Sequence, residues 1–264
     1  MTKNQTPTTD ISLISKSIET RVQAIELEIK VIREQMLTFD KIQTEGSASP
    51  NTIRSASTRE ELRAHVARIT PTLEGWCSPS KAELLSNLIV ENDCKNVVEI
   101  GIFGGRSLIP MALTMKYLGR GQVWGVEPWS NSVAVETETN AVNDAWWASV
   151  DFSKIKRGYF ETLFREDLLL IARTLEVSSD VAYEALKLSK YDLIHIDGSH
   201  SEVQAYNDAV RWAALLGPNG ILVFDDIAWP SVAKARRWIL DNFEVLNEVY
   251  ENDSVSYGAY RKRQ

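Results

Sequence analysis

An apolar run that ends in a glycine-rich turn, residues 97–107, constrains the fold more than any other part of the sequence. Glu99 stands just before the turn, and Gly101, Gly104 and Gly105 follow before an apolar helical pattern begins. This order predicts a buried strand, a tight turn and the first residues of a helix. Because glycine has no Cβ, such a turn lets a ligand approach the backbone closely. The acid disfavours a phosphate ligand and suits a cationic or hydroxyl-bearing one.

The composition is that of an ordinary soluble globular protein. A chain of 264 residues with 44% hydrophobic and 25% charged residues can hold one sizeable α/β domain plus an appendage. The net charge of −7 provides no basic surface for nucleic acid. The sequence shows neither the run of roughly 18–20 apolar residues that spans a bilayer nor the apolar core of a signal peptide. We therefore expect a cytoplasmic protein without nucleic-acid or membrane partners, in which Cys77 and Cys94 are reduced packing residues.

Residues 11–39 are predicted to form a long helix with a narrow apolar seam. The apolar positions alternate in spacings of four and three, as in a coiled-coil heptad, and charged residues fill most of the rest. We expect this helix to pair with other copies of the chain, although folding back on its own domain would bury the same seam. Residues 1–45, with a disordered start, then form an oligomerisation segment, and residues 46–264 form the main domain.

Strand and helix patterns alternate from residue 96 onward. Near-continuous apolar runs predict strands that are covered on both faces, as in a parallel sheet. These strands are expected at 96–100, 122–127, near 174–177, 191–196 and 220–224, and a closing hairpin at 243–250 and 255–261. The fold class is thus α/β, a doubly wound and mostly parallel seven-stranded sheet with a C-terminal antiparallel hairpin.

Two helix starts are visible before the first strand. Either Ser57 with Glu60 or Thr58 with Glu61 forms a capping box for a helix that runs to about residue 69. Ser78 precedes a proline and predicts the start of a second helix that runs to about residue 90.

Acidic residues gather at the predicted carboxyl ends of the strands. Glu99, Glu127 and Asp197 follow the first, second and fourth strands, and Asp225 and Asp226 follow the fifth. In open α/β sheets, ligands bind beyond these ends. The acids therefore predict a ligand site rather than a solvated face.

Glu127 is suited to bind two neighbouring ribose hydroxyls, as the acid of a dinucleotide site does. A dinucleotide turn, however, has the pattern G-x-G-x-x-G, whereas this chain has E-x-G-x-x-G-G-x-S. The Glu99 carboxylate would repel a pyrophosphate, which disfavours an NAD enzyme. The alternative for Glu127 is a surface acid without a role.

Asp197, Asp225 and Asp226 are predicted to lie a few ångströms apart, because neighbouring strands end there. Three such carboxylates repel one another unless they are protonated or bridged by a cation. Their hard oxygen ligands suit Mg²⁺, Mn²⁺ or Ca²⁺. In the alternative arrangement only Asp197 points inward, and Asp225 or Asp226 caps the next helix.

Two histidines have different expectations. His200 lies three residues after Asp197 on a loop, and an imidazole pKa of about 6.5 makes it a candidate general base. It could equally be a passive loop residue. His195 alternates inward on a buried strand and is expected to be a core residue with a hydrogen-bond partner.

Polar and aromatic residues complete the predicted site. Ser179 could hydrogen-bond an adenine edge or simply cap the following helix. Trp129, Trp146 and Trp147 follow Glu127 and could stack on a ring or wall a substrate pocket, although packing is the commoner role of a tryptophan.

With these residues in place, the chain resembles the class I S-adenosylmethionine (SAM)-dependent methyltransferases. Within them it is similar to the metal-dependent O-methyltransferases, which include bacterial sugar and antibiotic-tailoring enzymes and, more distantly, catechol O-methyltransferase. The resemblance runs from about residue 74 to the tail hairpin and is carried by residues 98–107, 125–129, 192–200 and 216–226. The predicted coiled coil lies outside it.

The resemblance implies SAM as the cofactor and a divalent ion, Mg²⁺, Mn²⁺ or Ca²⁺, held by Asp197, Asp225 and Asp226. Glu99 and the glycine turn would hold the amino-acid end of SAM, Glu127 its ribose, and Ser179 would lie near the adenine. Where catechol O-methyltransferase has an Asn and a Lys, this chain has Asp226 and His200. The residues expected to bind the cofactor are Glu99, Gly101, Gly104, Gly105, Ser107, Glu127, Pro128, Trp129, Ser179 and Asp197.

The function expected from the resemblance is metal-assisted transfer of a methyl group from SAM to a hydroxyl of a sugar, glycoside or phenol. The metal would lower the pKa of the hydroxyl, and His200 or Asp197 would remove its proton. Two alternatives stay open, a metal-independent N- or O-methyltransferase and a non-catalytic SAM-binding subunit of an oligomer. Activity that survives EDTA would rule out the metal mechanism, and SAM binding without turnover would indicate the subunit.

Overall fold

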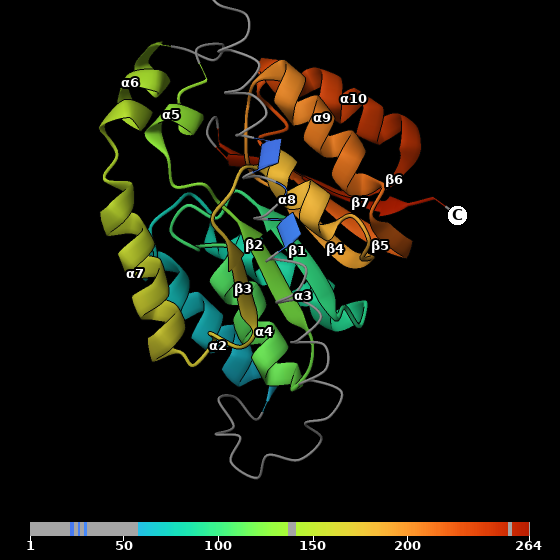
Figure 1. The fold of residues 1–264 in the computed structure, drawn as a ribbon. Coiled ribbons are helices and arrows are strands. Elements are labelled where there is room, and N and C mark those ends of the chain that lie inside the picture. Colours follow the sequence, from blue (N-terminus) through green and yellow to red (C-terminus); the bar gives the residue numbers. More distant parts are fainter. Residues whose placement is uncertain are drawn as a thin grey trace, which may run out of the picture.

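The computed structural model describes residues 58–136, 141–252 and 255–263, together with five residues between positions 22 and 30. Its described part contains a seven-stranded sheet with helices on both faces (Figure 1). The strand order is β3-β2-β1-β4-β5-β7-β6. The first five strands are parallel, and β7 is antiparallel to both of its neighbours. The predicted α/β fold with a closing hairpin is confirmed.

The strands begin and end close to the predicted positions. They are β1 Asn96–Ile100, β2 Gln122–Val126, β3 Ala172–Leu175, β4 Tyr191–Ile196, β5 Leu216–Asp225, β6 Phe243–Asn252 and β7 Val255–Lys262. The largest difference is β5, which begins at Leu216 rather than at residue 220. Its pairing with β4 shifts register between Tyr191 and Leu193, where the Gly-Pro-Asn-Gly segment 217–220 forms an irregular stretch inside the strand. Those residue types are typical of turns, and the predicted strand began only at the last of them, Gly220.

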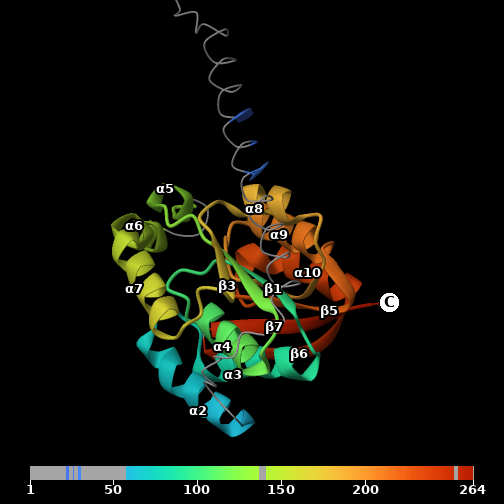
Figure 2. The same ribbon diagram turned by 60° about the horizontal axis from the view of Figure 1, so that its bottom comes forward.

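Helices cover the two faces of the sheet in separate layers (Figure 2). The helices are α2 Arg59–Ile69, α3 Pro79–Glu91, α4 Leu108–Leu118, α5 Asn131–Ala134, α6 Ala141–Ser149, α7 Phe152–Arg165, α8 Ser179–Leu186, α9 Glu202–Ala213 and α10 Ala233–Asn242, with short 3-10 turns at Thr70–Thr72 and Pro230–Val232. Helices α2, α3, α4 and α7 pack on the face that carries Val97, and α8, α9 and α10 pack on the face that carries Val98. Adjacent residues of a strand point to opposite faces, so the apolar run of β1 serves both cores.

Both predicted helix starts are present. Thr58 is the N-cap of α2: its side chain accepts from the N–H of Glu61 at 3.1 Å, and the Glu61 carboxylate accepts from the N–H of Thr58 at 3.3 Å. Ser78 caps α3, and Pro79 occupies its first turn. Of the two candidate capping boxes, the pair Thr58 and Glu61 is confirmed. The start of α3 matters for the site, because its first turn carries a residue that reaches the ligand cavity.

The predicted coiled coil at 11–39 lies outside the described residues, apart from the five isolated ones, all helical. Pairing through its seam and the division at residue 45 therefore stay predictions. Among the described helices, none combines the length and the apolar character needed to cross a membrane.

Candidate active site

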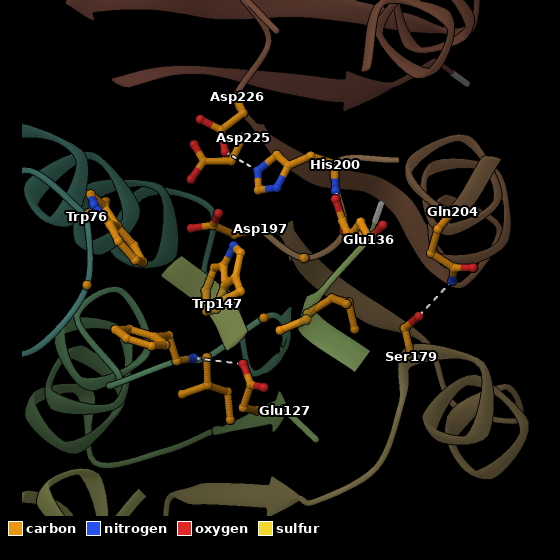
Figure 3. A pocket seen from close by; sticks show the side chains of 18 of the residues that line it. Trp76, Glu127, Glu136, Trp147, Ser179, Asp197, His200, Gln204, Asp225 and Asp226 are labelled. Carbon is orange, nitrogen blue, oxygen red and sulfur yellow. Dashed lines mark hydrogen bonds and ion pairs between the residues drawn. The ribbon is translucent and has the colours of Figure 1, made fainter. Parts of the chain in front are cut away.

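A cavity of about 850 Å³ opens at the carboxyl ends of the parallel strands. Its lining comes from the loops that follow β1, β2, β3, β4 and β5, from the first turn of α3, and from α6 and α9 (Figure 3). Of the predicted site residues, the lining includes Gly101, Ser107, Glu127, Pro128, Ser179, Asp197, His200, Asp225 and Asp226. The structure therefore brings these predicted residues together around one cavity at the carboxyl edge of the sheet.

The glycines of the turn allow a close approach, as the sequence suggested. The groups that approach them most closely, however, belong to the protein itself. Gly101 has φ +89°, and a Cβ there would lie 1.9 Å from the carbonyl oxygen of Asp197. Gly105 has φ +83°, and a Cβ there would lie 2.6 Å from the ring of Tyr159. Gly104 and Gly105 are not part of the cavity lining. These glycines therefore serve first to bring β1, β4 and α7 together, and only Gly101 presents backbone to the cavity.

Glu99 lies beneath the turn rather than in the cavity. Its side chain is 0% exposed, and its Oε1 accepts a hydrogen bond from Ser107 Oγ and lies 2.8 Å from His195 Nδ1. His195 is equally buried, which agrees with its expected core role. Ser107 lines the cavity, whereas Glu99 does not. Glu99 therefore contacts the Ser107 hydroxyl rather than the cavity, and the predicted direct contact with a cofactor does not follow from this placement.

Glu127 occupies the tip of β2 and faces the cavity (Figure 3). Its Oε2 accepts from the N–H of Phe103, and its Oε1 accepts from the N–H of Trp129, each at 3.0 Å. Burial raises the pKa of the Glu127 carboxyl, and the two backbone donors oppose that effect. The carboxylate is thus held in one orientation, with further acceptor capacity for a donor in the cavity.

Trp129 packs inside the protein and does not present its ring to the cavity for stacking on a ligand. Its indole N–H donates to the carbonyl of Phe103 at 2.8 Å, and its ring lies 5.6 Å from that of Tyr159. It is buried and is not part of the cavity lining. Trp129 thus ties the loop after β2 to the glycine turn.

A polar group at another part of the cavity joins α8 and α9. Ser179 Oγ donates to Asp208 Oδ2 at 3.1 Å, and Gln204 Nε2 donates to Ser179 Oγ at 3.0 Å and to Asp208 Oδ1 at 3.1 Å. Burial raises the pKa of Asp208 to about 7. Ser179 therefore lies where the sequence placed it, at the cavity, but within a network that the sequence did not reveal.

Asp197 and Asp225 are brought side by side because Ile196 of β4 pairs with Phe224 of β5. The ammonium of Lys81, from the first turn of α3, lies between them. Its Nζ is 3.1 Å from Asp197 Oδ2 and also donates to Asp225 Oδ2. The Lys81 side chain is only 2% exposed. Two of the three predicted metal ligands are therefore bound to a cation that belongs to the protein.

The charges of Lys81, Asp197 and Asp225 depend on one another. Burial lowers the pKa of Lys81, but Asp197 and Asp225 outweigh it and raise the pKa well above its usual value. Burial raises the pKa of Asp197, but Lys81 outweighs it and holds that pKa below the usual range. The pKa of Asp225 is raised by burial and by the charge of Asp197. At neutral pH Lys81 therefore carries its charge opposite an ionised Asp197.

Asp226, the third predicted metal ligand, pairs with His200 (Figure 3). His200 Nε2 hydrogen-bonds to Asp226 Oδ2, the backbone N–H of His200 donates to Glu136 Oε1 at 2.8 Å, and the imidazole stacks on Trp229 with centroids 4.7 Å apart. Burial lowers the pKa of His200, but the hydrogen bond and charge of Asp226, with Glu136 and Asp197, raise it overall. The imidazole is thus oriented by a carboxylate, as in a hydrolase triad.

A divalent ion bound by Asp197, Asp225 and Asp226 does not fit this arrangement. Such an ion would have to displace the Lys81 ammonium from two carboxylates and His200 from the third. Among the described residues, two groups bring three ligand atoms within 4.8 Å of one another: Glu99, His195 and Asp197, and Asp197, His200 and Asp226. In the first group, Glu99 and His195 do not line the cavity, so an ion there would be remote from an acceptor. In the second group all three residues line the cavity, and an ion bound through His200 Nε2 would interrupt the hydrogen bond between His200 and Asp226.

Aromatic rings form one wall of the cavity. Trp76, Phe103, Trp146 and Trp147 surround one another, with centroid distances of 5.2 Å from Trp76 to Phe103 and to Trp146, and 4.8 Å from Trp146 to Trp147. Trp76 is 54% exposed and Trp146 42% exposed, which is high for such large rings. The sequence pointed to Trp146 and Trp147 but not to Trp76, which precedes the family motifs.

Lys81 and Asp208, two of the site residues that were not predicted, share a signal that the sequence does contain. Lys81 lies four positions before Leu85, on the apolar side of its helix. Asp208 lies between Ala205 and Trp212, on the buried side of α9. A charged residue on the apolar face of a helix needs a buried partner, and these two have partners in the cavity.

Residues 98–227 match the family model for a methyltransferase domain. This match, 130 of the 264 residues, makes that part of the chain similar to a methyltransferase domain. No curated protein matches the chain. The family match begins within β1 and ends just after Asp226, so it contains every predicted site residue, whereas Lys81 and Trp76 lie before it.

Solved methyltransferase structures share the fold at low identity. The O-methyltransferase from Bacillus cereus in complex with SAH is 16% identical, over 78% of this chain and 92% of that one, with a TM-score of 0.54. The O-methyltransferase TomG from Streptomyces achromogenes, involved in tomaymycin synthesis and bound to SAM, is 14% identical over 79% and 92%, with a TM-score of 0.52. The SAH-bound Podospora anserina methyltransferase PaMTH1 is 14% identical over 77% and 88%, with a TM-score of 0.52. At these identities the likeness shows the fold alone.

Proposed function

We propose that this protein transfers the methyl group of SAM to a hydroxyl of a small molecule with a flat or sugar ring. The observation that carries the proposal is that one cavity contains both Glu127, a buried acceptor suited to a ribose, and His200, a base oriented by Asp226. Structures of similar fold are O-methyltransferases with SAM or SAH bound, which supports the same class of reaction.

The residues present fit SAM. The buried Glu127 carboxylate, fixed by two backbone N–H groups, can accept from both ribose hydroxyls. Ser107, held by Glu99, and the backbone at Gly101 suit the amino-acid end, and the network of Ser179 and Asp208 suits the adenine edge. A cavity of about 850 Å³ lies in the size range of small-ligand sites. Bound SAM supplies an electrophilic methyl group on a sulfonium.

His200 is the proposed general base. When the imidazole is neutral and its Nε2–H donates to Asp226, Nδ1 is left as the acceptor for a hydroxyl proton. Trp229 and Glu136 fix the position of this ring and of its backbone. The acceptor oxygen would thus be deprotonated as it attacks the methyl group, with the geometry set before the reaction.

The aromatic wall is the proposed acceptor subsite. Trp76, Trp146 and Trp147 present ring faces next to the cavity, and such faces bind flat rings and the apolar faces of sugars. This supports phenols and sugars or glycosides as the substrate class. Among the described residues, the cavity lining contains no comparable wall of basic residues for a phosphorylated acceptor.

The test is a screen of hydroxylated sugars, glycosides and phenols with SAM, in which SAH release is measured by mass spectrometry. We expect at least one class to be methylated on oxygen, and a Trp76→Ala variant to raise KM for it with less effect on SAM affinity. Binding of SAM without SAH release on any hydroxylated compound would contradict the proposal and favour a non-catalytic SAM-binding subunit. Methylation on nitrogen alone would identify an N-methyltransferase.

A further inference from the structure

Among the described residues, Lys81 is the one cation that lies between the carboxylates at the ends of β4 and β5. Its Nζ contacts Asp197 Oδ2 at 3.1 Å and donates to Asp225 Oδ2. The lysine comes from α3, 116 and 144 positions earlier in the chain than these aspartates. It lines the same cavity as His200.

The lysine is held in place along its whole length. Its backbone N–H donates to the N-cap hydroxyl of Ser78 at 3.1 Å, and the helix behind it is anchored by the fully buried Leu85 and Ile89. Its ammonium also lies 5.9 Å from the centre of the Tyr257 ring, within cation–π distance. The side chain is 2% exposed, so it has no free path to swing into solvent.

Adjacent buried carboxylates repel each other strongly unless one is protonated or a cation lies between them. A divalent ion is one solution, and a buried ammonium is another. Both cannot occupy the same space, since an ion that binds Asp197 Oδ2 and Asp225 Oδ2 would meet the Lys81 Nζ, and the two cations would repel in a dry site. The third acid, Asp226, is already paired with His200.

We propose that Lys81 takes the place of a divalent metal ion in this enzyme and that its methyl transfer is independent of metal. Lys81 is then a positioning residue: it holds Asp197 and Asp225 together at the cavity and leaves activation of the acceptor to His200. The proposal rests on the proposed methyl transfer only for its statement about activity. Its statement about ion binding stands on the contacts of Lys81 alone.

The test compares Mn²⁺ binding by three forms of the full chain, freed of metal by EDTA and dialysis: wild type, Lys81→Met and, as a control, Lys95→Met. Lys95 is an exposed lysine at the opposite end of β1, where it pairs with Asp93. Electron paramagnetic resonance and calorimetry report the bound Mn²⁺ without any need for an acceptor. We expect no stoichiometric site in the wild type or Lys95→Met, and one site in Lys81→Met, at least about tenfold tighter than any wild-type binding.

Two results would overturn the proposal. A wild-type Mn²⁺ site that Asp225→Asn or Asp226→Asn removes would show that an ion coexists with the lysine, and a Lys81→Met variant that gains no site would show that the lysine does not stand in for an ion. If Lys81→Met does not fold, the melting temperature of the wild type with and without Mn²⁺ decides instead: no shift supports the proposal, and a rise that Asp225→Asn abolishes overturns it.

Activity adds a separate readout once an acceptor is known. Wild-type turnover is expected to be unchanged by EDTA, whereas Lys81→Met is expected to need added Mg²⁺ or Mn²⁺ for the turnover that it retains. Wild-type turnover abolished by EDTA and restored by Mg²⁺ would overturn the metal-independent reaction. A failure to find any methyl acceptor would count against the proposed function and would leave the Mn²⁺ result as it is.

Discussion

At the scale of single residues, the site separates into groups with different partners rather than one cluster of acids. Asp197 and Asp225 share Lys81, Asp226 orients His200, and Glu99 holds Ser107. Each carboxylate has a hydrogen-bond donor, shared or its own, which is why several buried acids can coexist near one cavity. Single substitutions should therefore separate cofactor binding from proton transfer.

Replacing Glu127 by Gln is expected to weaken SAM binding by about 10- to 100-fold, because the hydrogen bonds from the ribose hydroxyls lose a charged acceptor. Turnover at saturating SAM should change little, since Glu127 does not face the reacting atoms in the proposed complex. Titration calorimetry with SAH measures the effect. Glu83→Gln is the matched control, because Glu83 is a half-exposed acid that pairs with Arg63 on the outer helices. An unchanged SAH affinity in Glu127→Gln would refute the ribose assignment.

The His200 base predicts a particular dependence on pH. A base works when deprotonated, so kcat/KM should rise with pH through the His200 pKa, which Asp226 raises above the ordinary value of about 6.5. Asp226→Asn removes that charge, so the acidic limb of the profile should move to lower pH, with a lower plateau. His200→Gln should reduce kcat by about 10²- to 10³-fold without loss of SAM affinity.

The measurement is kcat/KM between about pH 5 and 9. His65→Gln is the control for the histidine, because His65 lies on α2, where its ring contacts Glu166. An acidic limb that stays in place in Asp226→Asn would mean that another group carries the proton.

At the scale of elements, the turn after β1 shows how one position serves both fold and site. Gly101→Ala is expected to lower the free energy of unfolding by about 3 kcal/mol, because alanine is strained at φ +89° and its Cβ would meet the carbonyl oxygen of Asp197 at 1.9 Å. Gly158→Ala is the matched control: it lies in α7 with open space around its Cβ position, and should raise the free energy of unfolding by about 0.5–1 kcal/mol.

Urea denaturation measures both variants. Equal stability of Gly101→Ala and the wild type would mean that the end of β4 can move away from the turn.

The elements themselves were largely predictable, because their signals are local. The apolar runs gave β1, β2 and β4 to within a residue, and the Thr58 and Ser78 caps gave the starts of α2 and α3. The start of β5 was missed because its Gly-Pro-Asn-Gly stretch is typical of a turn, and only pairing with β4 extends the strand through it. Tertiary pairing there overrides local propensity.

At the scale of the whole molecule, the open question is how copies of the chain associate. The seam at 11–39 predicts pairing, so substitution of Ile25 and Ile32 by Asp in the full chain should convert an oligomer to a monomer while SAM binding is retained. Light scattering coupled to size exclusion measures the mass. Glu26→Gln, off the seam, is the control. A wild type that is already monomeric would favour a helix folded back on its own domain.

The sequence by itself determined the order of strands and helices, the edge of the sheet where the cavity lies, and four of the acids that line it, Glu127, Asp197, Asp225 and Asp226. Those features depend on periodicity and on position relative to a strand end, which are properties of neighbouring residues. Only the tertiary structure decided what each acid pairs with. Lys81 and Asp197 are 116 positions apart, and no local pattern specifies that a lysine from α3 meets the ends of β4 and β5. That contact depends on how α3 packs across the sheet. It changes the interpretation of Asp197 and Asp225, from ligands of a metal ion to partners of a lysine that belongs to the protein.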